Sequence, residues 1–370
     1  MIVQVLIIII ALLLWQFKFP DKVVLGSHKD AKFMMIMCVI LILQAGLRHE
    51  NCGADTLAYK EFWEIYKYKT WDSVLRDVQQ QFLFDPGFWI FMKASQYIFP
   101  TYQLFLLLSA AIFTSALCSF VFKLIDRNFD IVWFVLIYEC LFYSTLAECT
   151  IRQGYAIALC FFSYRFIEQR KLFPFLLTIF LASSVHGSAL VFLPFYFLHN
   201  TKRMGLVMTL AVIAVPILFS IKNEFVTFAV DTLNKEKYYG YKEAQDNSAY
   251  SFGIFYTFLF ALGIWFRSVY IKHKREAPDI LMAMTLGFAL LPMLFVSGTL
   301  MRVVQYYSIF MVVFVPTLHN CIIKYKKQFK YVFIGLFIIF FLKVIANNQR
   351  YAFFWQEMET YEQQVLRDGR

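Results

Sequence analysis

Charged residues are scarce in this chain. They make up 16% of its 370 residues, whereas 60% are hydrophobic and phenylalanine alone occurs 44 times. Soluble globular domains usually carry about 25% charged residues, and a surface with so few could not stay hydrated. The composition therefore excludes a soluble globular protein and predicts a polytopic membrane protein.

Several signatures of familiar chemistry are also missing. The sequence has no internal repeat, no phosphate-binding Gly-rich loop and no Gly-x-Ser-x-Gly elbow. Its seven cysteines are odd in number, lie mostly in apolar runs and show no Cys-x-x-Cys spacing. This pattern disfavours both a disulfide framework and a cysteine-ligated metal site.

What the chain has in abundance is apolar runs, most of them near the ~20 residues that a bilayer core requires. They lie at about 2–17, 32–47, 101–122, 131–147, 153–164, 205–221, 251–266, 280–296, 303–319 and 331–346. Two further stretches, 84–99 and 172–198, contain polar interruptions typical of re-entrant or broken helices. We predict an all-α polytopic membrane protein of about 10–12 transmembrane helices with one or two broken helices. Residues 1–346 would form a single membrane domain, followed by a tail at 347–370.

The distribution of basic residues predicts the topology. Lysines follow the first apolar run, which places that connection in the cytoplasm and the N-terminus outside. The predicted inner connections are 18–32, 123–130, 165–171, 199–203, 267–279 and 324–330. They hold 19 of the 35 Lys and Arg and 7 of the 25 Asp and Glu, a net of +12, so the rest of the chain is −2. The overall +10 thus reflects topology, and no nucleic-acid partner is expected.

Loop length limits the chemistry of the inner face. No predicted inner connection exceeds about 15 residues, far below the ~100 residues of a folded nucleotide-binding domain. The long connections 48–83 and 222–250 fall outside, as does the tail, so we expect function at the outer face. Only His49 and His186 lie on that side, which predicts a site without metal or cofactor.

Three arginines stand at the predicted outer ends of apolar runs: Arg48, Arg152 and Arg302. Each could snorkel to lipid headgroups, and Arg152 could also pair with Glu148 four residues earlier. A cluster of guanidinium groups would instead suit a diphosphate held at the membrane surface, because arginine offers paired donors and stays charged.

Other polar residues at this face have two interpretations each. Asp55 or Thr56 could cap the amphipathic helix that contains Tyr59, or could contact substrate. His186 lies between small residues at the break in 172–198 and is either a packing histidine or a titratable functional group.

The second outer loop is rich in tyrosine. These side chains could stack on sugar rings, but an interfacial aromatic belt is the more ordinary explanation. The residues are Tyr238, Tyr239, Tyr241 and Tyr250.

The segment LRHENCGADTLAYKEF (47–62) resembles the Arg-x-x-x-x-Gly-x-Asp-Thr-x-x-Tyr motif of the EpsG family of Wzy-like polysaccharide polymerases. Four downstream elements are similar to those of the family in the same order. They are Phe84-Asp85-Pro86-Gly87-Phe88, Ile151-Arg152-Gln153-Gly154-Tyr155-Ala156, LASSVHGSAL at 181–190, and Met301-Arg302-Val303-Val304-Gln305-Tyr306-Tyr307. The stretch before Gly53, HENC, departs from the family's usual small hydrophilic residues.

This resemblance implies a GT-C-like fold and a Wzy-type glycosyltransferase in the bacterial inner membrane, acting in O-antigen or capsule polysaccharide and lipopolysaccharide biosynthesis. Its partners would be undecaprenyl-diphosphate-linked oligosaccharide donor and acceptor, the lipid bilayer, and a chain-length regulator protein. In such a site Arg48, Arg152 and Arg302, together with Thr56, Tyr59 and Gln153, would bind the diphosphate and substrate. His186 would be the catalytic base, with Asp55 and Glu148 as competing candidates.

Two other classes remain open at this stage. A flippase or transporter of lipid-linked glycans would also have many helices, although such proteins more often show internal two-fold repetition. An outer-face O-antigen ligase or O-acyltransferase is the other alternative.

Overall fold

The computed structural model describes residues 2–21, 29–53, 55–79, 85–221, 224, 247–295, 300–325, 327–346 and 351–358. All regular secondary structure within these ranges is helical, and the β-structure there is an isolated bridge between Arg48 and Phe353. The all-α prediction is confirmed. The chain forms two compact units: Met1–Arg165, Phe173–Gly187 and Val332–Arg370 make the first, and Phe166–Leu172 and Ser188–Tyr331 make the second.

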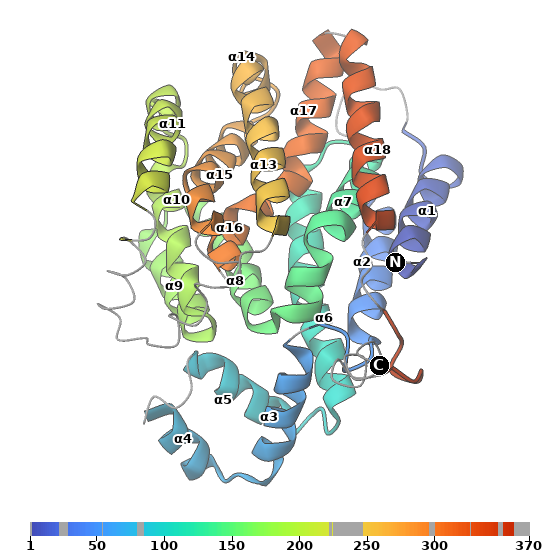
Figure 1. Cartoon of the computed structure of the whole chain (residues 1–370), viewed down its shortest axis with the longest axis vertical. Coiled ribbons are helices and arrows are strands. Elements are labelled where there is room, and N and C mark those ends of the chain that lie inside the picture. The colour runs from blue at the N-terminus through green and yellow to red at the C-terminus, as the bar shows by residue number, and fades with distance from the viewer. Residues whose placement is uncertain are drawn as a thin grey trace. The chain divides into compact units, whose positions relative to one another are not determined.

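The first unit contains the N-terminal helices and the last one (Figure 1). They are α1 (Ile2–Phe17), α2 (Ala31–Gly46), α3 (Thr56–Tyr68), α4 (Trp71–Gln79), α5 (Pro86–Ser95), α6 (Tyr102–Leu124), α7 (Asn128–Leu141), the π-helix η1 (Tyr143–Cys149), most of α8 (Ile151–Glu168), most of α9 (Leu172–Val185) and most of α18 (Lys330–Ala346).

Helices α2 and α6 pack against each other along their length and run antiparallel. Gly46 permits the closest approach, because a Cβ there would lie 2.9 Å from the Cα of Leu107. Asp30 caps the start of α2 by accepting a hydrogen bond from the Lys32 amide at 2.7 Å, and Thr101 caps α6 in the same way.

The connections of this unit meet at opposite ends of α2 and α6. At one end, the Lys29 ammonium donates to the carbonyl of Ile125 at 3.0 Å, a contact between residues of two predicted inner connections. At the other, His49 donates to Ala352 and Phe354 donates to Leu47, which docks residues 351–358 beside 47–52. The two groups match the predicted inner and outer connections, while the membrane face that each occupies stays a prediction.

Helices α3, α4 and α5 lie together at the end of α2 and the start of α6 (Figure 1). They enclose an aromatic core that includes Trp63, Phe88, Trp89 and Phe105. The Lys93 ammonium is buried in this layer and donates to the carbonyl of Tyr66 at 2.7 Å. The helix within the stretch predicted at 84–99 is α5, and the re-entrant or broken helix expected there stays a prediction.

Three helical stretches are long and apolar enough to cross a membrane: Tyr102–Leu124, Ala277–Phe295 and Met301–Ile323. Six shorter apolar helices accompany them in the described part of the chain. The predicted break in 172–198 is present, since α9 ends at Val185 and a 3₁₀-helix begins at Gly187. A second break was not predicted: α7 and η1 meet at 70°, within the apolar run predicted at 131–147.

The second unit is built around α15, which packs against α10, α11, α13, α16 and α17. Its elements are η2 (Gly187–Phe192), α10 (Leu193–Leu198), α11 (Met204–Ser220), α13 (Asn247–Trp265), α14 (Arg267–Tyr270), α15 (Ala277–Ala289), η4 (Leu291–Phe295), α16 (Met301–Ser308), α17 (Met311–Tyr325) and η6 (Lys327–Phe329). Gly287 lets α13 approach α15, where the Tyr256 hydroxyl donates to the Met284 carbonyl at 2.9 Å.

Candidate functional site

Asp85 is the centre of a polar cluster in the first unit. Its Oδ2 accepts hydrogen bonds from Arg152 Nη1 at 3.0 Å and from His186 Nδ1 at 3.1 Å. Its Oδ1 accepts one from the Gly187 amide at 3.0 Å. The three side chains are 13–22% exposed, so the cluster is screened from bulk solvent but accessible. Residues far apart in the sequence thus form one charged site.

The backbone around Asp85 is shaped for this role. Asp85 has φ 64° and ψ 62°, the left-handed region that aspartate tolerates better than most residues, and Pro86 then starts α5. Gly87 lies directly against α9, because a Cβ there would come within 2.5 Å of the Ser184 Oγ and 3.0 Å of its carbonyl oxygen. This close approach brings the start of α5 to the end of α9, where His186 follows.

Arg152 is held by two further groups besides Asp85. Its Nε donates to the Tyr59 hydroxyl at 3.2 Å, and its guanidinium carbon lies 5.8 Å from the ring centres of both Tyr59 and Trp89. Such cation–π contacts favour a charged, oriented guanidinium. Among the described residues, Nη2 has no hydrogen-bond acceptor, so part of the guanidinium fork is open to a ligand.

The electrostatics of the cluster keep Asp85 ionised. Burial alone would raise the pKa of Asp85, but the hydrogen bond and charge of His186, the charge of Arg152 and the Gly187 amide outweigh it. The pKa of Asp85 therefore lies below its ordinary value. An ionised carboxylate only accepts hydrogen bonds, so Nδ1 of His186 carries the hydrogen and the lone pair of the neutral ring lies on Nε2.

Arg48 occupies a different environment from Arg152. It is 1% exposed, and its guanidinium donates to the carbonyls of Ala45 and Glu148. The Thr56 hydroxyl donates to the same Glu148 carbonyl at 2.7 Å, and Gly53, at φ +89°, lies against it. Arg48, Gly53 and Thr56 thus form a clamp on the end of η1, which we call the Glu148 clamp.

The two carboxylates considered as alternative bases have different surroundings from His186. Asp55 precedes α3, but its side chain makes no capping hydrogen bond; its charge instead interacts with that of Arg152. Glu148 is 3% exposed at the end of η1. The ion-pair partner of Arg152 within the described structure is Asp85, which replaces the helical pair with Glu148 considered from the sequence.

The motifs that meet at this cluster can be compared with those of known proteins. The model of the EpsG family matches residues 31–361, which is most of the chain. The chain belongs to the EpsG family. This membership of EpsG indicates a polysaccharide-polymerase-like role in polysaccharide biosynthesis. No curated protein and no solved structure is significantly similar to the chain.

Four of the five EpsG-like segments found in the sequence converge in the first unit. They contribute Tyr59, Asp85, Arg152 and His186. Asp85 was not among the site residues expected from the sequence. The sequence feature that could have identified Asp85 is its position in the EpsG-like segment Phe84-Asp85-Pro86-Gly87-Phe88. Without that resemblance, Pro86 and Gly87 indicate only a turn.

Other site residues expected for this EpsG protein lie elsewhere or outside the described residues. Gln153 is fully buried in α8, and Arg302 is half-buried in α16 of the second unit. Tyr250 is exposed at 42% and lies with its ring centre 4.8 Å from that of Phe295. Tyr238, Tyr239 and Tyr241 lie outside the described residues.

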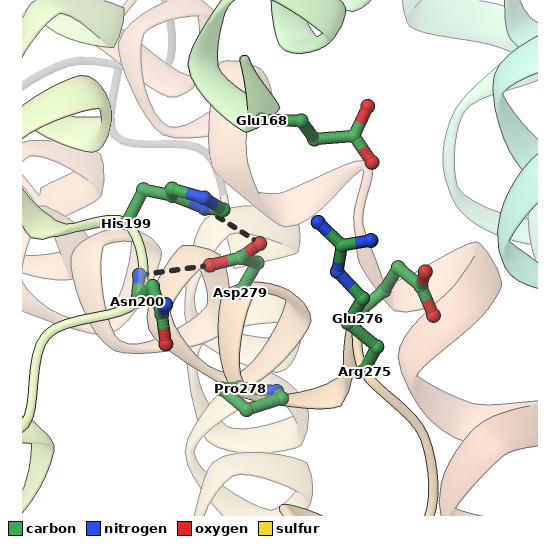
Figure 2. Close-up of a pocket in the computed structure, with 7 residues that line it drawn as sticks. All are labelled: Glu168, His199, Asn200, Arg275, Glu276, Pro278 and Asp279. Atoms are coloured by element: carbon green, nitrogen blue, oxygen red, sulfur yellow. Dashed lines mark hydrogen bonds and ion pairs between the residues drawn. The ribbon is translucent and has the colours of Figure 1, made fainter. Parts of the chain in front are cut away.

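The second unit has a polar cavity of its own. Asp279 joins two elements there, accepting from the Asn200 amide at 3.3 Å and pairing with His199 at 2.7 Å (Figure 2). Three predicted inner connections meet at this cavity, which is lined by Glu168, His199, Asn200, Arg275, Glu276, Pro278 and Asp279. In the described part of the chain, no group of three or more His, Cys, Asp or Glu residues is arranged to hold a metal ion.

Proposed function

We propose that this EpsG-family protein is a Wzy-type polymerase. It transfers a growing glycan from undecaprenyl diphosphate onto an incoming lipid-linked repeat unit at the outer face of the bacterial inner membrane. The product is an O-antigen, capsule or exopolysaccharide chain. The observation that carries this proposal is the cluster in which Asp85 joins Arg152 to His186, because it combines a cation and a base in one partly accessible site.

The reaction needs both groups. The bond between the anomeric carbon and the diphosphate oxygen breaks, and undecaprenyl diphosphate leaves with the electron pair. A bond forms between the same carbon and a hydroxyl oxygen of the acceptor, whose proton passes to Nε2 of His186. Arg152 binds the diphosphate and stabilises the charge that develops on it, in the partly buried setting where such stabilisation is strongest.

The source of activated sugar follows from the same features. The predicted inner connections are too short to hold a nucleotide-binding domain. A donor already activated by a lipid diphosphate removes the need for one.

Deletion of the gene tests this function directly. We expect the deletion strain to lose the polysaccharide ladder but to keep a single repeat unit on its lipid A core, because a polymerase acts after the unit is exported. Complementation with the intact chain should restore the ladder. Loss of every repeat unit would instead indicate a flippase or an O-antigen ligase, and a normal ladder with altered acylation would indicate an O-acyltransferase.

A further inference from the structure

One oxygen atom of the cluster serves two partners. Arg152 Nη1 and His186 Nδ1 both donate to Oδ2 of Asp85, at 3.0 and 3.1 Å, while Oδ1 is held by the Gly187 amide at 3.0 Å. The carboxylate is therefore fixed by the backbone and shared by the two groups that the proposed reaction needs. An arginine whose charge is already neutralised by a carboxylate is a poor ligand for a diphosphate unless that contact is exchanged.

We infer that Asp85 is a positioning residue that couples donor binding to the base: an arriving diphosphate takes over Nη1 of Arg152, and Oδ2 of Asp85 is left to His186 alone. This inference rests on the proposed function. No covalent bond forms or breaks in this exchange. It changes which donor the carboxylate serves, and Asp85 then orients the imidazole with Nε2 toward the acceptor hydroxyl.

The contacts around Arg152 make this exchange feasible. Tyr59 holds Nε at 3.2 Å and the rings of Tyr59 and Trp89 flank the guanidinium, so Arg152 stays in place when Asp85 releases it. The released Nη1 and the open Nη2 then form the paired donors that a phosphate accepts. The Gly187 amide meanwhile keeps the carboxylate beside His186.

The coupling makes an unusual kinetic prediction. Removing the charge of Asp85 should weaken the base but also free Arg152 from its competitor. We therefore expect kcat to fall while the affinity for the diphosphate stays the same or improves. A residue that merely supports the fold would lower both.

The experiment uses the full chain, purified and placed in lipid, with Asp85→Asn. Asparagine tolerates the left-handed backbone at this position as aspartate does. The substrate is the lipid-linked repeat unit that accumulates in the deletion strain, and the binding probe is undecaprenyl diphosphate. We expect kcat to fall at least about tenfold, within the range of general-base effects. Undecaprenyl diphosphate should inhibit the variant at least as tightly as the wild type.

The pH profile supplies a second readout. The charged and titratable groups of the first unit at this site are Asp55, Tyr59, Asp85 and Arg152. Asp85→Asn removes the carboxylate whose Oδ2 is shared between Arg152 and His186, so the acidic limb of the kcat profile should differ from that of the wild type. In the His186→Gln background, Asp85→Asn should cause no further loss, because Asp85 acts through the ring.

The matched control is Asp77→Asn. Asp77 lies in α4, and its carboxylate pairs with Lys69. It should change neither the pH limb nor the inhibition. An unmoved acidic limb together with weaker inhibition in Asp85→Asn would overturn the coupling. A wild-type protein that fails to extend chains would count against the proposed function instead. If Asp85→Asn is not recovered folded, Asp85→Glu decides: a displaced carboxylate should lower kcat, and wild-type kcat would refute positioning.

Discussion

Two arginines that look alike in the sequence have different surroundings. Arg48 and Arg152 both stand at the end of an apolar run next to a family motif. In the structure Arg48 is enclosed and bound to backbone carbonyls, whereas Arg152 faces a carboxylate, a tyrosine hydroxyl and two aromatic rings. The two arginines therefore differ in burial: Arg48 is enclosed, and the Arg152 side chain is 22% exposed.

This contrast gives the first prediction. Arg48→Ala would remove the side-chain donor to the buried Ala45 carbonyl and the weaker of two donors to the Glu148 carbonyl, which keeps Thr56. A buried carbonyl left without a donor costs about 1–3 kcal/mol, so we expect a lower yield of folded protein. Arg152→Ala should give a normal yield but abolish chain extension, and Arg152→Lys should restore little because the paired donors are lost. Yield is measured by size-exclusion chromatography in detergent and extension by the polysaccharide ladder. A well-folded Arg48→Ala without extension would place Arg48 in the diphosphate site.

His186 gives the second prediction. As the proposed base, the ring accepts the proton of the acceptor hydroxyl at Nε2, so removing that atom should stop turnover. Because the pKa of Asp85 lies below its ordinary value, Asp85 stays ionised and a loss of activity above roughly pH 5 cannot come from it. His186→Gln should lose turnover at every pH and still bind undecaprenyl diphosphate. Unchanged turnover per folded molecule would move the base to Asp55 or Glu148.

At the scale of elements, the Glu148 clamp joins the start of α3 to the end of η1. Gly53 is the position where space is most limited: its φ is +89°, and a Cβ would lie 2.6 Å from the Glu148 carbonyl oxygen. The hydroxyl of Thr56 reaches the same oxygen, and the carbonyl of Thr56 accepts from Tyr102 at 2.7 Å. The clamp thus links three elements through backbone atoms.

The third prediction follows from that geometry. Gly53→Ala adds a methyl group both to a strained backbone and to an occupied space, so it should lower the thermal midpoint of unfolding and the yield. Gly335→Ala is the matched control, because nothing lies within 4 Å of a Cβ at that helical position. The measurement is the thermal midpoint of unfolding of both variants and the wild type in detergent. Equal midpoints would show that the loop can move away from η1 without cost.

The sequence predicted elements better than the contacts between them. The runs at 2–17 and 331–346 correspond closely to α1 and α18, because uninterrupted apolar residues in lipid must form helices. The bend after Leu141 was missed, since hydropathy does not distinguish α- from π-helical hydrogen bonding. Asp85 was missed as a site residue because its partner His186 is 101 residues away, a separation that no local pattern encodes.

At the scale of the whole molecule, connections that are distant in sequence lie together at the ends of helices. In the first unit, residues 351–358 lie beside 47–52, and Lys29 contacts Ile125 at the other end of α2 and α6. In the second unit, three connections predicted to be inner meet at one cavity. Each grouping agrees with the charge-based topology.

The fourth prediction tests that topology. Alkaline phosphatase fused after the C-terminus should be active, because the segment at 351–358 lies beside the predicted outer connection at 47–52. The same enzyme fused after Asn200 should be inactive, since that connection carries the positive charge of an inner loop. Green fluorescent protein at the two positions should give the reverse pattern. Reversal of both results would invert the orientation and place the Asp85 cluster on the inner face.

The fifth prediction concerns metal removal. Arginine supplies the positive charge in the proposed reaction, so purified protein should extend chains in excess EDTA at the rate seen with magnesium. The measurement is the rate of extension before and after chelation. An absolute requirement for a divalent ion, restored by adding it back, would contradict the arginine-based mechanism.

The π-helix after α7 has a consequence for how the gene can vary. Each turn of η1 closes one residue later than an α-helical turn, so this segment holds more chain than an α-helix of the same path would need. Deletion of one residue within 143–149 would remove the extra residue of the π-helical turns and keep the reading frame. It would also rotate the Glu148 carbonyl by about 100° around the helix axis, away from Arg48 and Thr56. We therefore expect natural relatives to keep the length of this segment nearly constant.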